Sequence, residues 1–467
     1  MYRGRIKRIH FVGIGGSGMN GIAEVLLNMG YEVTGSDIAA SAPVKRLTQL
    51  GASVHIGHRK ENVSKAQCVV YSSAIGESNP ELMAASELNI PIIPRAEMLA
   101  ELMRMKYGIA IAGTHGKTTT TSLIASIFAL ADVDPTVVTG GKLNSIGANA
   151  RLGKGDILVA EADESDGSFL KLTPTMTVVT SIDREHMNHY QSLDDLHEAF
   201  IGFMNKVPFY GVNILCLDHP VIQGLLPRVS RRVTTYGLAA QADVRGTNLA
   251  YDGMSTSFDL FLRGRELGSI TLRLPGAHNV QNALAAAGVA LELDIGFEII
   301  KKGLESFSGV ERRFHVRGIM GGVTVVDDYG HHPEEIKAVL KGAKESFNKR
   351  IVAVFQPHRY SRTADLFNDF LSAFNDVDKL VVTDIYAAGE EPIEGINGHA
   401  LYEAIREHGH KDITYIKVVA HVPEYLKGIV RGGDLVLTLG AGDVWKAGTG
   451  LLECLKSEDK KQDRRVL

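Results

Sequence analysis

Cysteine is scarce in this chain, which has only Cys68, Cys216 and Cys454 among its 467 residues. Their odd number and wide spacing argue against a disulfide framework and against a paired-cysteine zinc site. Long hydrophobic runs are lacking too, since no apolar stretch approaches the roughly 18 residues of a membrane-spanning helix. The basic start leads into glycines rather than into the apolar segment of a signal peptide. We therefore expect a cytoplasmic protein without membrane insertion.

The chain also lacks an excess of charge of either sign. Its 50 Lys and Arg residues face 54 Asp and Glu residues, which gives a formal net charge of -4. No overall field therefore attracts nucleic acid or anionic lipid, and we expect no nucleic-acid partner. Any anionic ligand must be held by local groups, and both a monomer and a homodimer agree with this composition.

Apolar residues are plentiful at 45% of the chain, and the length exceeds the roughly 250 to 300 residues that one hydrophobic core can organise. Strand-like apolar runs alternate with helical patterns, and this rhythm, typical of parallel α/β sheets, restarts twice. We predict strands at 9–12, 108–112 and 323–327, each leading through a turn into a helix. Residues 244–274 look like an antiparallel subregion, and the charged residues 457–467 are predicted to be a frayed tail.

A glycine-containing loop, Gly113-Thr114-His115-Gly116-Lys117-Thr118, lies between the second of these strands and its helix. In such a loop the backbone N–H groups and the helix N-terminus attract phosphates. Lys117 is placed to reach the β and γ oxygens, and Thr118 to bind Mg²⁺. The standard pattern has glycine where Ile111 stands, so a purely structural turn remains an alternative.

A second glycine turn opens the chain, where Gly13, Gly15 and Gly18 form G-x-G-x-x-G after a strand. Asp37 ends the next strand about 20 residues later, as in dinucleotide-binding folds. The pattern indicates a pyrophosphate near a helix N-terminus and a carboxylate near a ribose. NAD, FAD and a UDP-sugar all fit it, and tight strand-to-helix packing without any ligand is the alternative.

These two turns belong to a longer series of motifs that runs in order along essentially the whole chain. The other members are Glu161-Ala-Asp163-Glu164-Ser-Asp166, His186-Met-Asn-His189-Tyr190, His278-Asn279-Val-Gln-Asn282, Arg312-Arg313-Phe314, Asp327-Asp328-Tyr329-Gly330-His331-His332-Pro333 and His358-Arg359-Tyr-Ser-Arg362. The series resembles the Mur ligase family. The resemblance implies three α/β domains: a Rossmann-like domain at 1–105 for the UDP-sugar, a P-loop ATPase-like domain at 106–320 and a Rossmann-like domain at 321–467 for the amino acid.

The resemblance also implies an ATP site and a Mg²⁺ site, in which Mn²⁺ can substitute. The implied ATP-binding residues are Gly113, Thr114, His115, Gly116, Lys117, Thr118, Thr119, Asn279, Asn282, Arg313 and Asp328. The implied metal ligands are Thr118, Glu161 and His186, and the implied catalytic residues are Lys117, Glu161, His186 and Arg313. By itself the sequence does not distinguish Glu161 from its acidic neighbours, and the pattern around His186 alone favours a core or surface histidine over a metal ligand. Asn279 could also simply cap a helix.

Two further sets of residues are implied for the substrates. Those for the UDP-sugar are Gly15, Ser17, Gly18, Asp37, Ser72 and Ser73, and those for the amino acid are Tyr329, His331, His358, Arg359 and Arg362. An arginine fork after a strand can clamp the carboxylate of an amino acid and orient its amine. The alternative is a basic loop at a domain interface.

The activity implied by the resemblance is a ligation in peptidoglycan synthesis. ATP converts the lactyl carboxylate of UDP-N-acetylmuramate into an acyl phosphate, which the amine of L-alanine then attacks. Other branches of the family carry a carbamylated lysine about where Ile201 stands here, and its lack favours the alanine-adding branch. The alternatives are a related ligase that recycles a preformed tripeptide, a nicotinamide-dependent oxidoreductase and a non-catalytic nucleotide-binding regulator.

Overall fold

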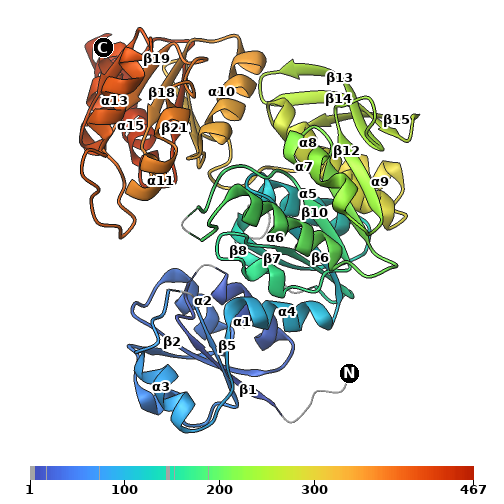
Figure 1. Cartoon of the computed structure of the whole chain (residues 1–467). Helices are drawn as coiled ribbons and strands as arrows, with labels where there is room; N and C mark the ends of the chain where they lie inside the picture. Colours follow the sequence, from blue (N-terminus) through green and yellow to red (C-terminus); the bar gives the residue numbers. More distant parts are fainter. Residues whose placement is uncertain are drawn as a thin grey trace. The chain divides into compact units, whose positions relative to one another are not determined.

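The structure is a computed structural model of the chain that describes residues 6–16, 18–72, 74–143, 148–151, 153–187 and 189–466, with the side chains of 140–143, 148–151 and 458–466 left out. Three β-sheets follow one another along the chain (Figure 1). The chain divides into two compact units: Met1–Asn248, Asp259–Ile270 and Gln281–Val310 form the first, and Leu249–Phe258, Thr271–Val280 and Glu311–Leu467 form the second. The domain boundaries that the sequence predicts after residues 105 and 320 stay predictions.

The first sheet has five parallel strands in the order β3-β2-β1-β4-β5. Its strands are β1 (Arg8–Val12), β2 (Glu32–Asp37), β3 (Ser53–Ile56), β4 (Cys68–Tyr71) and β5 (Ile92–Pro94), and its helices are α1 (Met19–Asn28), α2 (Ala42–Gln49), α3 (Pro80–Glu87) and α4 (Arg95–Arg104). Parallel strands covered by helices are buried on both faces, which explains the apolar run that ends at Val12. The predicted first strand and helix are confirmed.

A carboxylate is buried in this first block. Glu81 of α3 is fully buried, and it accepts hydrogen bonds from the Ser36 hydroxyl and the Asn62 amide. The rings of His10 and His58 lie 3.5 and 3.4 Å from its Oε2 atom. Burial raises the pKa of Glu81, but the nearby His10 ring and the hydrogen bonds from Ser36 and Asn62 outweigh it and bring this pKa to about 2.

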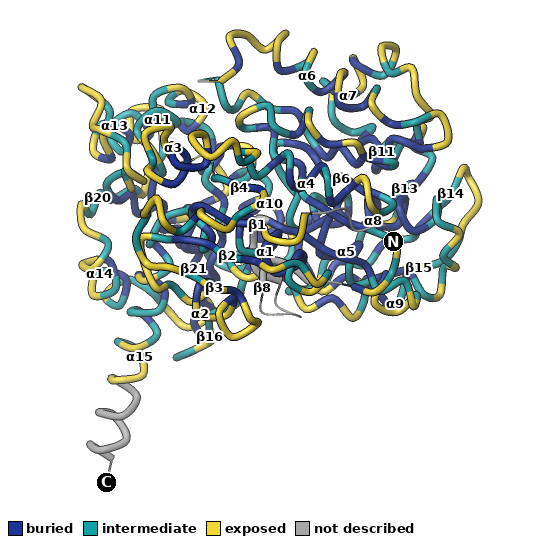
Figure 2. Tube along the Cα trace, turned by 90° about the horizontal axis from the view of Figure 1, so that it is seen from below, coloured by how far each residue is buried: buried dark blue, intermediate teal, exposed yellow. Residues whose placement is uncertain are grey.

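The central sheet has ten strands in the order β15-β14-β13-β12-β11-β10-β6-β9-β7-β8. Its strands are β6 (Tyr107–Ala112), β7 (Thr136–Leu143), β8 (Ala148–Arg151), β9 (Ile157–Glu161), β10 (Met176–Val179), β11 (Val212–Cys216), β12 (Val233–Gly237), β13 (Val244–Asp252), β14 (Ser255–Leu262) and β15 (Arg265–Leu272). Its helices are α5 (Lys117–Leu130), α6 (Leu193–Asn205), α7 (Pro220–Leu225), α8 (Ala277–Glu292) and α9 (Phe297–Glu305). In Figure 2 strand β6 is dark blue, whereas the turn between β14 and β15 is yellow and exposed.

The last sheet has six strands in the order β16-β17-β21-β18-β19-β20, and only the β16–β17 pair is antiparallel. Its strands are β16 (His315–Met320), β17 (Val323–Asp328), β18 (Ile351–Phe355), β19 (Lys379–Val382), β20 (Ile413–Tyr415) and β21 (Leu435–Leu439). Its helices are α10 (Pro333–Phe347), α11 (Tyr360–Asp365), α12 (Phe367–Phe370), α13 (Gly398–Glu407), α14 (Val422–Ile429) and α15 (Trp445–Val466). The predicted strand and the helix that begins at Pro333 are confirmed.

The end of the chain differs from the prediction. Helix α15 continues to Val466, so the frayed tail predicted at 457–467 is wrong for all but its last residue, which lies outside the described part. Two physical reasons favour the helix: Ala447 and Leu451 anchor its first turns in the core, and Lys, Glu, Gln and Arg are good helix formers.

Candidate active site

The phosphate loop joins β6 to α5 and has two glycines with positive φ, 129° at Gly113 and 81° at Gly116. A Cβ at Gly113 would lie 2.2 Å from Oγ1 of Thr180, and one at Gly116 would lie 2.5 Å from Oδ1 of Asn282. Both positions therefore require glycine for backbone conformation and for space. Asn282 also accepts a hydrogen bond of 3.2 Å from the Thr120 hydroxyl, which ties α8 to this loop.

The segment after β10 holds the loop from the other side. The N–H groups of Thr114 and His115 donate to the carbonyl and the hydroxyl of Ser181, both at 3.0 Å. In return, the N–H of Asp183 donates to Oγ1 of Thr114 at 2.8 Å. Because a second strand end fixes its backbone, the loop is organised before any phosphate binds.

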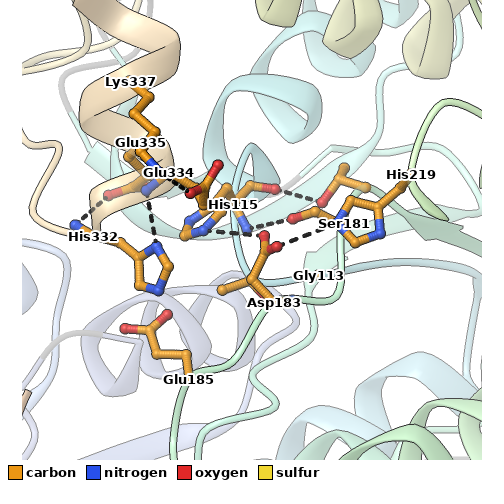
Figure 3. Close-up of polar contacts among 12 residues, drawn as sticks. Gly113, His115, Ser181, Asp183, Glu185, His219, His332, Glu334, Glu335 and Lys337 are labelled. Carbon is orange, nitrogen blue, oxygen red and sulfur yellow. Dashed lines mark hydrogen bonds and ion pairs between the residues drawn. The ribbon is translucent and has the colours of Figure 1, made fainter. Parts of the chain in front are cut away.

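Asp183 lies between two histidines, as Figure 3 shows. Its two carboxylate oxygens are 3.3 Å from Nε2 of His115 and 3.3 Å from Nε2 of His219. Burial raises the pKa of Asp183, but the contacts with both histidines outweigh it and hold this pKa far below its usual range. No motif in the sequence indicated Asp183 or His219.

Lys117 forms the main ion pair of the loop. Its Nζ atom lies 2.7 and 3.0 Å from the two carboxylate oxygens of Glu164, which is almost fully buried. Burial lowers the pKa of Lys117, but Glu164 outweighs it, with smaller contributions from Asp163 and Glu161, so the pKa lies above its usual value. Among the acids that the sequence left open, Glu164 is therefore the partner of the lysine.

The three carboxylates of residues 161–164 act on one lysine, and this excess of negative charge fits a bound cation. Glu161 ends β9, Thr118 opens α5, and Nε2 of His186 lies 3.9 Å from Oε1 of Glu164. In the described part of the chain no three His, Cys, Asp or Glu residues form a metal-binding group. Mg²⁺ commonly takes only one or two protein carboxylates and completes its shell with water and phosphate oxygens, so this set fits Mg²⁺.

The first glycine turn joins β1 to α1, and Gly18 at the helix start has φ 78°. Oδ2 of Asp37 accepts a hydrogen bond of 2.9 Å from the N–H of Gly15. Ser72 lies beside Gly13, since a Cβ added there would be 3.6 Å from its Cβ atom. The structure thus brings four of the predicted UDP-sugar residues to one turn, namely Gly15, Gly18, Asp37 and Ser72. The other two, Ser17 and Ser73, lie outside the described residues.

In the second unit Arg313 and Asp328 lie close to Tyr329. The Arg313 guanidinium is 5.3 Å from the centre of the Tyr329 ring, and it donates to Oε1 of Glu335 at 3.2 Å. Asp328 accepts hydrogen bonds of 2.7 Å from the N–H groups of Phe314 and Gly330. Burial raises the pKa of Asp328, although Arg313 offsets part of that rise. Arg313 and Asp328 are thus held in place by neighbours of the same unit.

Asn279 lies within the first turn of α8 and is not its N-cap residue. Helix α8 begins at Ala277, two residues earlier, and the Asn279 amide donates to the carbonyl of Pro275 at 2.8 Å.

At the start of α10, His332 and Glu335 form a capping box, and the His332 ring accepts from the N–H of Glu334 (Figure 3).

Of the predicted amino-acid residues, Tyr329 and His331 follow β17, and His358, Arg359 and Arg362 follow β18. The His358 ring stacks on Tyr386 with 5.6 Å between centroids, and lies 5.9 Å from the His331 ring. Nη1 of Arg362 is 3.2 Å from Nδ1 of His358. Burial lowers the pKa of His358 to about 4, helped by His331 and Arg362, so its ring is neutral at pH 7. Arg359 is half exposed and lies 4.0 Å from Glu390.

A cavity of about 490 Å³ opens beside this segment, at the carboxyl ends of β18, β19, β20 and β21. Open α/β sheets commonly bind ligands at this edge. Tyr386 lines the cavity, and its ring stacks on the ring of His358. No motif in the sequence indicated Tyr386, which is an isolated tyrosine.

Models of three protein families match the chain in order. The Mur ligase catalytic domain matches residues 8–107, the Mur ligase middle domain residues 111–290, and the Mur ligase glutamate ligase domain residues 312–442. The three matches correspond to the three sheets.

Individual proteins agree with this result. The UDP-N-acetylmuramate–L-alanine ligase of Geotalea daltonii is 57% identical over 97% of this chain and 99% of its own length. The crystal structure of the UDP-N-acetylmuramate-alanine ligase of Thermotoga maritima is 28% identical, has a TM-score of 0.79 and covers 97% of this chain and 99% of its own. A murein peptide ligase from Psychrobacter arcticus, 22% identical with a TM-score of 0.68 over 96% of this chain and 98% of its own, shares the fold. The three ordered domain matches and the full-length identity show that the chain belongs to the Mur ligase family.

Proposed function

We propose that this protein is an ATP-dependent ligase that joins L-alanine to the lactyl carboxylate of UDP-N-acetylmuramate in peptidoglycan synthesis. The observation that carries the proposal is the 57% identity, over 97% of the chain, to a ligase of that description. The two glycine turns of the first unit suit two phosphate-bearing substrates, which are ATP and the sugar nucleotide in this reaction. We assign residues 1–105 to the sugar nucleotide, 106–320 to ATP and 321–467 to the amino acid.

The first half-reaction transfers the γ-phosphoryl group of ATP to the lactyl carboxylate. Loop N–H groups and Lys117 bind the phosphate oxygens, and Lys117 offsets the charge that develops on them in the transition state. Thr118, Glu161 and His186 are the proposed Mg²⁺ ligands, and the ion when bound neutralises phosphate charge. Glu164 keeps Lys117 charged and directed at the loop, because the buried pair favours the ammonium form.

The second half-reaction is attack of the alanine amine on the acyl phosphate. Arg359 and Arg362 are the proposed clamp for the alanine carboxylate, since a guanidinium can donate two parallel hydrogen bonds to it. The neutral His358 ring lies against Arg362 and fixes its position. The amine bonds to the acyl carbon, and the tetrahedral intermediate then expels phosphate.

Release of phosphate from ATP tests the proposal directly. With UDP-N-acetylmuramate present, we expect L-alanine to stimulate phosphate release far more than glycine, L-serine, D-glutamate or the tripeptide L-alanyl-γ-D-glutamyl-meso-diaminopimelate. Product formation should require all three substrates. Stimulation by the tripeptide instead of alanine would assign the chain to the recycling activity, and phosphate release that no amine stimulates would contradict a ligase.

A further inference from the structure

Arg95 is the first residue of α4, and its side chain lies against the first glycine turn. A Cβ added at Gly18 would be 3.0 Å from Nη1 of Arg95 and 3.4 Å from its Cδ atom. The guanidinium thus occupies the space beside the left-handed residue that precedes α1. No motif in the sequence indicated Arg95, because it is separated from this turn by more than 70 residues of chain.

The same guanidinium also reaches the acidic segment of the central sheet. Its Nη2 atom lies 3.7 Å from Oδ2 of Asp163, the residue before the partner of Lys117. The two side chains are 20% and 47% exposed, so a ligand from solvent can reach both. Arg95 therefore stands between the two glycine turns of the first unit and touches the surroundings of each.

This ion pair contributes little by itself. A separation of 3.7 Å exceeds the hydrogen-bond range of about 2.7 to 3.2 Å, and a partly exposed ion pair adds little to the stability of a fold. Among the contacts of the described residues, the Arg95 guanidinium donates no hydrogen bond. Its N–H donors are therefore available, and an anion that binds better than Asp163 can displace that carboxylate at low cost.

The first glycine turn needs a cation from elsewhere. Residues 13–18 contain no lysine or arginine, and Asp37 adds a negative charge to the turn through Gly15. Nearby Arg46 is already committed, because two of its nitrogens donate to Glu24 at 3.0 and 2.7 Å. Within the described part of the chain, the guanidinium beside Gly18 is that of Arg95, so a diphosphate at this helix start would meet N–H groups and this guanidinium.

We propose that Arg95 binds the diphosphate of the sugar nucleotide at the first glycine turn and exchanges Asp163 for phosphate oxygens. The inference rests on the proposed function, in which this turn holds UDP-N-acetylmuramate. Arg95 thereby supplies the first glycine turn with the cation that residues 13–18 lack. Arg95 is thus a residue of the substrate site, supplied by a helix distant in sequence.

Calorimetric titration of the full chain without ATP tests this role. Arg95→Ala should weaken binding of UDP-N-acetylmuramate about 10- to 100-fold, as expected for lost hydrogen bonds to a charged group. UDP should lose the same factor, because it carries the diphosphate but no lactyl carboxylate. The affinity of Arg95→Lys should lie between those of the parent and the alanine variant, since lysine keeps the charge but cannot donate two parallel hydrogen bonds. Arg104→Ala, an exposed arginine of the same helix, is the matched control and should bind like the parent.

Two comparisons distinguish direct binding of the ligand by Arg95 from a purely structural role of its ion pair. If Arg95 only links the first sheet to the central sheet through Asp163, then Asp163→Asn should weaken sugar-nucleotide binding as much as Arg95→Ala does. The proposal instead predicts no loss in Asp163→Asn, because the competing anion is removed. The affinity of Arg95→Ala for a non-hydrolysable ATP analogue and its thermal midpoint should stay at parental values.

Three results overturn the inference while the proposed function stands. The first is an unchanged affinity of Arg95→Ala for UDP-N-acetylmuramate, and the second is an equal loss of that affinity in Arg95→Ala and Asp163→Asn. The third is an Arg95→Ala variant that binds UDP like the parent but binds UDP-N-acetylmuramate more weakly. The last result would place Arg95 on the lactyl carboxylate. A parent chain that binds no UDP-N-acetylmuramate overturns the proposed function and the inference together.

Discussion

The first unit contains two strand–glycine–helix turns that look alike in backbone and differ in charge. In both, a left-handed glycine precedes the helix, Gly18 with φ 78° and Gly116 with φ 81°. The phosphate loop carries its own cation, Lys117, which is paired with the buried Glu164. The first turn carries none and instead binds the carboxylate of Asp37. The same backbone arrangement can therefore serve two phosphate ligands with different charge requirements.

The difference agrees with the two tasks in the proposed reaction. Phosphoryl transfer develops charge on moving oxygens, so its loop needs a cation held in place and a fixed backbone. The second strand end, with Ser181 and Asp183, fixes that backbone. In the same proposal the first turn holds a diphosphate that does not react, so the proposed contact with Arg95 serves binding alone.

The largest effect is expected for Lys117→Ala. Loss of the loop cation should lower ligation by at least about 1000-fold, because charge on the transferring oxygens is no longer offset. Binding of UDP-N-acetylmuramate should stay within about 3-fold of the parent, since the other turn holds it. Phosphate release and calorimetric titration measure the two quantities, with Lys154→Ala, an exposed lysine of the same unit, as control. Comparable loss of sugar-nucleotide affinity would show that the two turns are not independent.

Acid should act on the first turn through the buried carboxylate of Glu81. The carbonyl of Ser36 accepts from the N–H groups of Gly13 and Ile14, and its hydroxyl donates to Glu81. The pKa of Glu81 is lowered from 4.5 to about 2, so its ionised form stabilises the fold by about 3 kcal/mol above pH 4.5. This stabilisation is lost as the pH falls from about 4.5 toward 2, because the unfolded chain then binds the proton first.

Glu81→Gln tests this assignment. The variant should lose about 2 to 3 kcal/mol of unfolding free energy at pH 7 and show a weaker dependence of stability on pH between 5 and 3. Urea unfolding at several pH values measures both. Glu87→Gln, an exposed residue at the end of the same helix, should behave like the parent. An unchanged pH dependence in Glu81→Gln would mean that another group carries the acid sensitivity.

A matched pair of glycine substitutions should affect different substrates. Gly116→Ala places a Cβ 2.5 Å from Asn282, and Gly18→Ala places one 3.0 Å from Arg95, each at positive φ. Strain and steric overlap should raise KM for ATP about 10-fold or more in the first variant, and KM for the sugar nucleotide by a similar factor in the second. Gly224→Ala has open space around it and serves as control. A variant that raised both KM values equally would contradict separate sites.

The arginines after β18 form the proposed third anion site, which would use side chains instead of a glycine turn. Arg362→Ala and Arg359→Ala should each raise KM for L-alanine about 10-fold and leave ATP binding unchanged, because a charge-assisted contact with the alanine carboxylate is lost. Steady-state kinetics measure this, with the exposed Arg406→Ala as control. Alaninamide should discriminate little between parent and variants. A normal KM for alanine with weakened ATP binding would assign these arginines to the nucleotide.

Local patterns were sufficient for much of the fold. The strands at 9–12, 108–112 and 323–327 and the helices after them are confirmed, because buried parallel strands are continuous apolar runs and glycine turns mark their ends. The charged end of the chain was predicted wrongly, since composition alone does not show that α15 is anchored by its first turns. The assignments of individual ATP, sugar and alanine residues stay predictions.

By itself the sequence determined the α/β class, the two glycine turns and the family, because these depend on residues that are close together in the chain. The tertiary structure alone decided which acid pairs with Lys117, that Asp183 bridges His115 and His219, and that Arg95 lies on the turn at Gly18. Each of these contacts joins segments far apart in sequence. Strand order brings such segments together, and no local pattern of residues records which strand ends become neighbours.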